Sequence, residues 1–226
     1  MTTDSTFSEG TRNLLDPNRT VNPDSVTKLD DLADLSSESL WKLYALAKTP
    51  AIEDLEGRLV GRMLTVPGLE NPSVARTLRG FAASGTFPWQ GKTFDSHGDG
   101  TGEGINRVLG DRKNWFRFAT FIGPSRAGDF DALHLNYDNP GNPTPIRAVK
   151  DELREVAPGL WLGLAYLRLP GGKFHMALFF GLSNHPDAQS GQAPSLGKRH
   201  SKGLLATVIG LPLLLAGAWW LLKQRK

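Results

Sequence analysis

Between residues 57 and 182 the sequence is built from short apolar runs that are separated by Gly, Asn and Pro. Short runs that end at turn-forming residues, repeated at intervals of about 8–12 residues, are typical of all-β domains. This spacing leaves little room for the helices of βαβ units, so it predicts an antiparallel barrel or sandwich. The predicted strands are Gly57–Val66, Gly91–Phe94, Gly102–Leu109, Asn114–Ile122, Phe130–Tyr137, Leu160–Leu169 and Phe174–Leu182.

The last two runs form the clearest hairpin, and neither has a polar face. In the first of them, Leu160, Leu162, Leu164 and Tyr166 alternate with Trp161, Gly163, Ala165 and Leu167. A strand that is apolar on both sides must be covered on both sides, or must face a cavity with apolar walls. Two explanations therefore stay open: a core on one side and a packed helix on the other, or a ligand cavity.

Segment 145–159 fits two secondary structures. Ile146, Val149, Leu153 and Val156 recur with the period of an amphipathic helix, and Pro145 suits the first turn of such a helix. As a strand, the segment places Asp151 and Leu153 on one face and Glu152 and Arg154 on the other. The periodicity by itself favours the helix.

Two motifs resemble a known family. The segment EGRLVG at 56–61, followed by WQGKTF at 89–94, is similar to the lipocalin-like GXWXG/DUF4334-type proteins, which pair G-x-W-x-G with a later W-x-G-K-x-F. Leu59 stands where that family has the first tryptophan. The family continues with an aspartate-bearing strand, a turn and apolar strands that end in aromatics, and Asp151–Val156, 157–159, Leu160–Tyr166 and Phe174–Phe180 are similar in order. The resemblance spans about residues 55–183, implies a small calycin-type antiparallel β-barrel, and favours the strand interpretation of 148–156.

The chain before the barrel has two parts. Residues 1–35 are rich in Thr, Ser, Asp, Asn and Pro without a sustained apolar period, so we expect them to be disordered. Leu40, Leu43, Tyr44 and Ala47 then follow a helical spacing behind candidate caps at 36–37, which predicts a short helix that packs on the domain. A second helical pattern covers Asn71–Ala83.

Residues 203–222, GLLATVIGLPLLLAGAWWLL, contain no charged side chain. Twenty helical residues reach about 30 Å, the thickness of the hydrocarbon core of a bilayer. Three basic residues flank each end, and a Trp pair marks the far edge, where aromatic rings favour the membrane interface. We therefore expect a transmembrane helix at 203–222, a flexible basic linker at 184–202, a basic tail at 223–226 and a barrel domain with its leading helix at 36–183.

The charge distribution supports the same interpretation. The sequence has 26 Lys and Arg against 23 Asp and Glu, and six of the basic residues lie in 198–226, where there is no acidic residue. These basic residues suit anionic lipid head groups, so nucleic acid is not an expected partner. Residues 1–10 lack the basic and apolar regions of a secretory signal, so we expect the domain on the cytoplasmic side of its membrane, although the equal basic flanks leave the orientation open.

Polar residues within the apolar strands are the candidate ligand contacts. A buried arginine needs an acidic partner or an anionic ligand, and Arg117, between Phe116 and Phe118, is the clearest case. An Arg–Glu pair across the barrel is the structural alternative. The candidate ligand-binding residues are Trp89, Arg117, Phe118, His134, Glu152, Arg154, Tyr166 and Phe180.

Three classes of function follow from these residues. The first is a membrane-tethered carrier or binding module for an apolar, lipid-like molecule with an anionic end. The second is a calycin-fold isomerase or lyase that acts on such a ligand with His134 or Glu152 as acid or base. The third is a membrane-anchored interaction domain. No cofactor or metal is expected, because the histidines lack ligand spacing and cysteine is absent. The oligomeric state stays open.

Overall fold

The computed structural model describes residues 23–68, 80, 82 and 87–185. The predicted transmembrane helix at 203–222, most of the predicted helix at 71–83 and the linker from residue 186 onward lie outside the described residues. Within the described part of the chain, no helix is long and apolar enough to cross a membrane.

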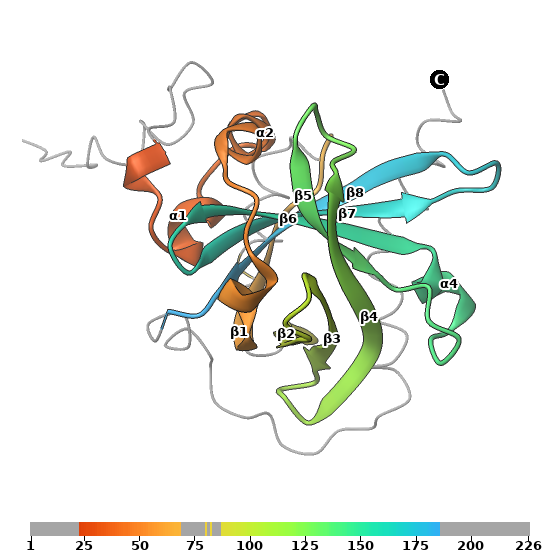
Figure 1. Ribbon diagram of the computed structural model, residues 1–226. Helices are drawn as coiled ribbons and strands as arrows, with labels where there is room; N and C mark the ends of the chain where they lie inside the picture. The colour runs from red at the N-terminus through yellow and green to blue at the C-terminus, as the bar shows by residue number, and fades with distance from the viewer. Residues whose placement is uncertain (1–22, 69–79, 81, 83–86, 186–226) are drawn as a thin grey trace, which may run out of the picture.

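Eight antiparallel strands close into a barrel in which each strand pairs with its neighbour in sequence, and β1 pairs with β8 (Figure 1). The mainly β class and the antiparallel barrel predicted from the sequence are confirmed. The strands are β1 (Gly57–Thr65), β2 (Trp89–Ser96), β3 (Thr101–Val108), β4 (Lys113–Pro124), β5 (Asp131–Asn136), β6 (Val149–Ala157), β7 (Leu160–Arg168) and β8 (Phe174–Ser183).

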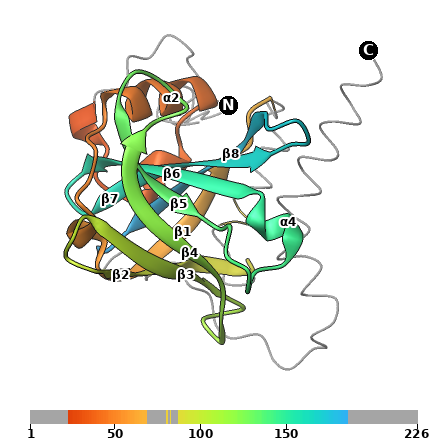
Figure 2. The same ribbon diagram turned by 45° about the vertical axis from the view of Figure 1, so that its right-hand side comes forward.

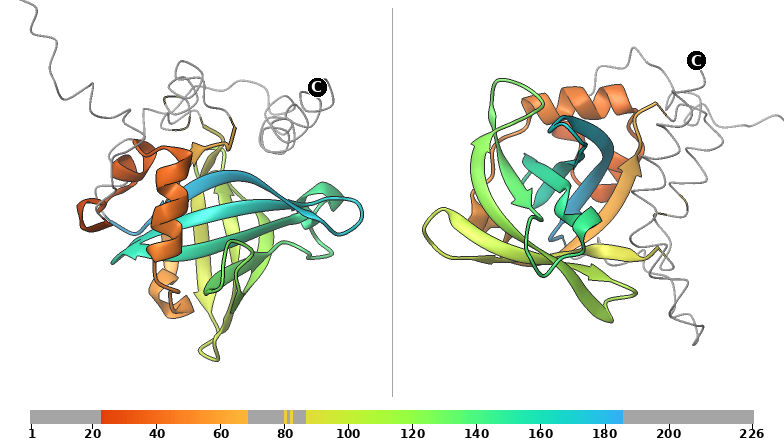
Figure 3. Two further views of the ribbon diagram at one scale, coloured as in Figure 1. Left: turned by 90° about the horizontal axis from the view of Figure 1, so that it is seen from above. Right: turned by 90° about the vertical axis from the view of Figure 1, so that its right-hand side faces the viewer.

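Helices cover one side of the barrel wall. The helix α1 (Leu29–Ala33) and the longer α2 (Ser37–Leu46) precede β1, with 3-10 helices at Pro23–Ser25 and Ile52–Leu55. The Ser36 hydroxyl accepts from the Ser39 amide and caps α2, as the sequence predicted. Figure 3 shows α2 lying across the outside of the barrel.

The expectation of disorder through residue 35 is wrong for its last part. Leu29 and Leu32 of α1 are buried, and they lie over Gly181 of β8, where an added Cβ would meet the Leu29 side chain at 2.6 Å. Because glycine has no side chain, α1 can pack directly on the wall at Gly181. Because this helix is only five residues long, its periodicity is too short to recognise in the sequence.

The wall separates two apolar clusters. One cluster lies inside the barrel and takes Leu59, Phe94, Phe118, Leu153, Trp161 and Phe180 from strands around it. The other lies outside, where Leu160, Leu162, Leu164 and Phe179 pack beneath α1 and α2. Strand β7 is apolar on both faces because one face lines the interior and the other carries the helices.

Segment 145–159 contains both of the structures its sequence allowed. A four-residue helix α4 (Thr144–Arg147) comes first and leads into β6 (Figure 2). Strand β6 then pairs with β5 and β7 over the part that carries Asp151 and Leu153. The strand that the family resemblance favours is confirmed, and the longer helix that the periodicity favours is wrong, because pairing on both edges outweighs the helical pattern.

Candidate functional site

A lysine and an aspartate meet inside the barrel. The Lys92 Nζ on β2 lies 3.1 Å from the Asp151 Oδ2 on β6, and the two side chains are only 4% and 5% exposed. A bulge in β2 between Trp89 and Gly91, with Gly91 at φ 138°, turns both Trp89 and Lys92 inward. Without it, the alternation of a strand would place residues three apart on opposite faces.

Two neutral side chains complete the cluster. Lys92 Nζ donates to Asn106 Oδ1 at 2.9 Å and to the Tyr137 hydroxyl, besides Asp151. The Tyr137 hydroxyl donates to Asp151 Oδ2 at 3.2 Å and accepts from Asn106 Nδ2 at 3.1 Å. Asn106 Oδ1 also accepts from Trp89 Nε1 at 3.0 Å. We call Lys92, Asn106, Tyr137 and Asp151 the interior polar cluster.

Four aromatic rings surround the ammonium group. The Nζ of Lys92 lies 5.2–5.4 Å from the ring centroids of Trp89, Phe118, Tyr137 and Phe180. Ring faces attract a cation at such distances, and the attraction is larger away from water. Tyr137 is the exception, because its hydroxyl rather than its ring face meets Nζ. The rings and the carboxylate together offset part of the cost of burying Lys92.

Glycines in the wall hold some of these rings against the backbone. A Cβ added to Gly163 would stand 2.2 Å from the Phe180 ring, and one added to Gly104 would stand 2.4 Å from the Phe118 ring. Such distances are far shorter than van der Waals contact, so the rings lie directly on the glycine backbone. Small residues at these positions thus let the rings line the wall of the interior.

Burial acts on both members of the ion pair in opposite directions. It lowers the pKa of Lys92, and the Asp151 charge works against that change. Burial also raises the pKa of Asp151, and here Lys92 works against it. Burial and the nearby Asp151 charge raise the pKa of Tyr137 well above its ordinary value, so the phenol stays protonated.

Three buried polar atoms in the interior lack a hydrogen-bond partner among the described residues: Asp151 Oδ1, the indole Nε1 of Trp161 and the Thr120 hydroxyl. The first is an acceptor, the second is a donor, and the hydroxyl can be either. Because burying an unpaired polar group costs free energy, these atoms mark where the interior could bind a polar group of another molecule.

The residue after Asp151 faces the opposite side of the wall. Glu152 is fully buried and accepts from the Ser125 hydroxyl at 2.7 Å, from the Arg126 amide at 3.1 Å and from the Arg126 guanidinium. His134 Nδ1 lies 3.3 Å from Arg126 Nη1 and 3.7 Å from Glu152 Oε1. These contacts hold the 125–129 loop against β5 and β6, outside the barrel.

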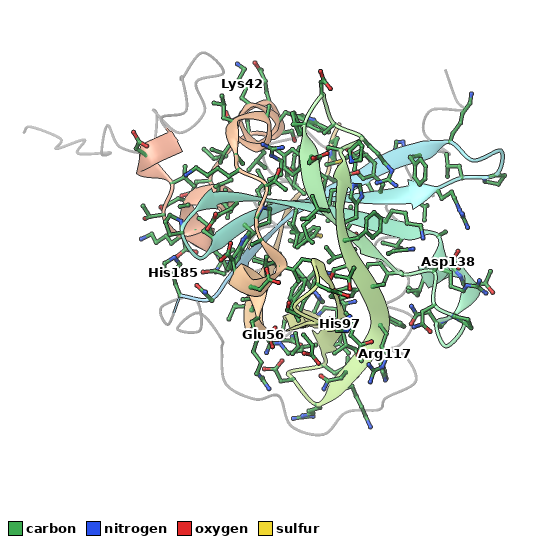
Figure 4. The ribbon with its side chains drawn as sticks, in the orientation of Figure 1. Lys42, Glu56, His97, Arg117, Asp138 and His185 are labelled. Atoms are coloured by element: carbon green, nitrogen blue, oxygen red, sulfur yellow. The ribbon has the colours of Figure 1, made fainter. Side chains whose placement is uncertain are left out.

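The other polar candidates also lie outside the interior. Arg154 donates to the carbonyl oxygens of Ala47 and Asp131, so it ties α2 to the wall. Tyr166 belongs to the cluster beneath the helices. Arg117 is 59% exposed and lies 3.1 Å from Glu103. Figure 4 shows it on the outer side of β4. The expectation that Arg117 is buried is therefore wrong, and its partner Glu103 lies on the neighbouring strand β3 at the surface, not across the barrel.

The structure brings together only part of the predicted set. Trp89, Phe118 and Phe180 lie in the interior around the ammonium group, whereas the other five lie outside it: Arg117, His134, Glu152, Arg154 and Tyr166. Sequence reasoning missed Lys92 and Asp151, although one stands in the W-x-G-K-x-F motif and the other begins the aspartate-bearing strand. Each is two residues from an inward apolar residue, Phe94 or Leu153, and that alternation was the available signal.

This arrangement can bind polar groups and can hold a proton between an amine and a carboxylate. It offers no obvious cation site, because no group of three or more His, Cys, Asp or Glu among the described residues could hold a metal ion.

Comparison with known proteins adds little to this geometry. No protein-family model and no curated protein matches the sequence. A similar solved structure is that of a protein from Thermomonospora curvata, 16% identical, which covers 67% of this chain and 88% of its own with a TM-score of 0.41. A similarity of this size carries no argument about function, so the interpretation rests on the site itself.

Proposed function

We propose that the barrel binds a small apolar molecule in its interior and that the protein is a membrane-tethered carrier or binding module for that molecule. The observation that carries the proposal is the interior polar cluster, which lies within aromatic walls. Apolar walls with a few fixed polar groups are the usual lining of small-molecule sites. The W-x-G-K-x-F motif, which contributes Trp89 and Lys92, and the order of the later strands also support a relationship to the GXWXG/DUF4334-type barrels.

The tether is the second part of the proposal. The uncharged run at 203–222 has the length and the flanks of a single membrane span. The seventeen residues at 186–202 can extend about 3.3 Å each, which gives the barrel a reach of roughly 55 Å from the membrane. Carbonate extraction of membranes that contain the full chain tests the anchor, and release of the protein into the supernatant would exclude it.

Binding can be tested with ten-carbon probes that share one tail, namely decanol, decanoate and decylammonium. Burying about 200 Å² of such a tail is worth about 5 kcal/mol before ordering costs, which by itself corresponds to a dissociation constant of only about 0.2 mM, so tighter binding also needs the polar contacts. Trp161 belongs to the apolar cluster inside the barrel and Trp89 packs against it, so tryptophan fluorescence should report the binding of a probe there, and calorimetry measures its affinity. We expect at least one probe to bind, and failure of all three would exclude this function.

A pair of matched variants locates the binding. Ala165 faces the interior and is paired with Asp151, so Ala165→Leu adds volume beside the polar cluster. Ala157 packs on the outer cluster, so Ala157→Leu makes the same change on the other side of the wall. We expect only Ala165→Leu to abolish binding while both variants stay folded. Equal effects would place the ligand elsewhere.

The ion pair also favours a second candidate function, an isomerase or lyase that acts on the bound molecule. Burial brings the pKa values of Lys92 and Asp151 closer together, which suits groups that exchange protons with a ligand. Asp151 would then be the acid or base in place of His134 or Glu152, which lie outside the barrel. Exchange of deuterium from D2O into a bound ligand, absent in Asp151→Asn, is the test.

A further inference from the structure

We infer that the ligand of this barrel enters with an uncharged hydrogen-bond donor, such as an alcohol hydroxyl, and that Asp151 Oδ1 accepts this bond. The inference rests on the proposed binding function and specifies the chemical class of its ligand. It departs from the anionic end group that the sequence suggested.

Every hydrogen-bond donor of the interior polar cluster already has an acceptor within the protein. The ammonium group of Lys92 has three protons, and it has three acceptors in Asn106, Tyr137 and Asp151. Asn106 uses both amide protons, on the Phe116 carbonyl and on Tyr137, and its oxygen accepts from Trp89 and Lys92. No donor of the cluster is therefore left for an anionic head group.

The unused acceptor of the interior polar cluster belongs to Asp151. Its Oδ2 accepts from Lys92 and from Tyr137, whereas its Oδ1 is buried without a partner among the described residues. Lys92 Nζ has one acceptor for each ammonium proton and lies 3.1 Å from Asp151 Oδ2, so this geometry favours the ion pair, in which Oδ1 of the ionised carboxyl is an acceptor. A ligand that satisfies this atom must donate a hydrogen bond.

The charge balance of the interior polar cluster also favours an uncharged end group. The cluster contains one ammonium and one carboxylate, so its net charge is zero. A carboxylate end group near Asp151 Oδ1 would place two like charges together away from water, which is costly. A cationic end group would compete with Lys92 for the same carboxylate and would leave the cluster with an unbalanced positive charge. A hydroxyl provides the donor without either penalty.

Trp161 adds an independent element. Its buried Nε1 is a donor without a partner among the described residues, and Trp161 belongs to the apolar cluster inside the barrel. An oxygen acceptor elsewhere on the ligand, such as an ester or ketone carbonyl, would satisfy it. The inferred class is thus an apolar alcohol that can carry a second, accepting oxygen.

The experiment compares decanol, decanoate and decylammonium by calorimetry on the full chain in a mild detergent, with Asp151→Asn as the variant. In the wild-type protein we expect decanol to bind at least tenfold more tightly than either charged probe. In Asp151→Asn the cluster gains one net positive charge, and the amide nitrogen replaces the free acceptor with a donor. The preference should therefore shift toward decanoate by at least tenfold.

Glu152→Gln is the matched control, because it neutralises the neighbouring carboxylate on the outer side of the wall. It should leave the order of the three probes unchanged, and thermal unfolding of both variants verifies that each is folded. Tighter or equal binding of decanoate by the wild-type protein, or an unchanged order in Asp151→Asn, would overturn the inference while the binding function stands. Failure of every probe would overturn the binding function and this inference with it.

Discussion

Asp151 and Glu152 are consecutive residues on β6, and both carboxylates are buried, yet they face opposite sides of the barrel wall. Glu152 receives hydrogen bonds at both oxygens from the 125–129 loop. Asp151 has one oxygen in full use and one without a partner among the described residues. The protein's own chain supplies the hydrogen bonds of Glu152, whereas Asp151 can accept one from another molecule.

This difference separates a structural role from a binding role better than burial or charge does. Both carboxylates are paired with a cation and both lie under apolar cover, so neither property distinguishes them. The count of satisfied hydrogen bonds does distinguish them, since a buried atom without a partner costs free energy and persists in few places.

Lys92→Met should give the largest effect, because it leaves the Asp151 carboxylate buried without its cation. Removing one partner of a buried ion pair typically costs about 3–5 kcal/mol. Without Lys92, the pKa of Asp151 in the folded protein lies above its value in the unfolded chain, so the stability contributed by the protonated form is lost as pH rises through the folded pKa. Urea unfolding between pH 4.5 and 8 should show a deficit relative to wild type that grows with pH.

The double variant Lys92→Met/Asp151→Leu is the control for that result. Replacing both members of a buried pair with apolar side chains is often neutral or stabilising, so most of the lost stability should return and its pH dependence should disappear. A double variant as unstable as Lys92→Met would show that the pair is needed for the fold itself. Binding of decanol should be lost in the double variant, which lacks Asp151 Oδ1.

Glu152→Gln should destabilise the protein less, by about 1.5–3 kcal/mol, the usual range for hydrogen bonds to a charged group. Its partner Arg126 has a side chain that is 27% exposed, so water can solvate the guanidinium after the change. Hydrogen exchange should speed up at the amides of Arg126 and Ala127, which Glu152 and Ser125 hold. Faster exchange in the interior strands instead would contradict a role confined to the loop.

Seven of the eight strands could be predicted from the sequence because their signals are local, whereas β6 and the choice of a barrel over a sandwich came from the family resemblance. Turn residues bound those seven strands, and the predicted ranges agree with the observed ones to within a few residues, as for Phe174–Leu182 against Phe174–Ser183. The same alternation places Arg117 outward, since its neighbours Phe116 and Phe118 both face the interior. Treating Arg117 as buried ignored that period.

The site depends on contacts that no local pattern contains. Lys92 and Asp151 are 59 residues apart, and only closure of the barrel brings β2 and β6 within reach. The bulge at Gly91 also breaks the alternation that would relate Trp89 to Lys92. Alternation with Phe94 and with Leu153 could have identified one buried cation and one buried anion, but their pairing required the three-dimensional structure.

Tyr137→Phe should have a smaller effect than Lys92→Met, about 1.5–3 kcal/mol, because it removes one neutral hydroxyl that bonds to both charged groups but leaves the ion pair in place. The ammonium of Lys92 loses one acceptor and Asp151 Oδ2 loses one donor, while the ion pair remains. Chemical unfolding at pH 7 measures the change, and Tyr44→Phe, in the outer cluster, is the matched substitution. We expect decanol binding to survive in both, since Asp151 Oδ1 is untouched.

A loss of decanol binding in Tyr137→Phe alone would mean that the phenol, rather than the carboxylate, receives the ligand.

Arg117→Ala should give the smallest effect, and it tests directly whether an exposed pair differs from the two buried carboxylates. The side chains of Arg117 and Glu103 are 59% and 48% exposed, and exposed pairs contribute about 0–1 kcal/mol. Their mutual attraction is also screened by salt, so the small loss should shrink further as ionic strength rises. Glu103→Ala should give the same loss, and the double variant should show little more, because each single change already removes the pair. Binding of decanol and of decanoate should stay unchanged in all three variants. A selective loss of decanoate binding in Arg117→Ala would place an anionic head group on the outer face of β4, and the site would then have to move from the interior polar cluster to that face.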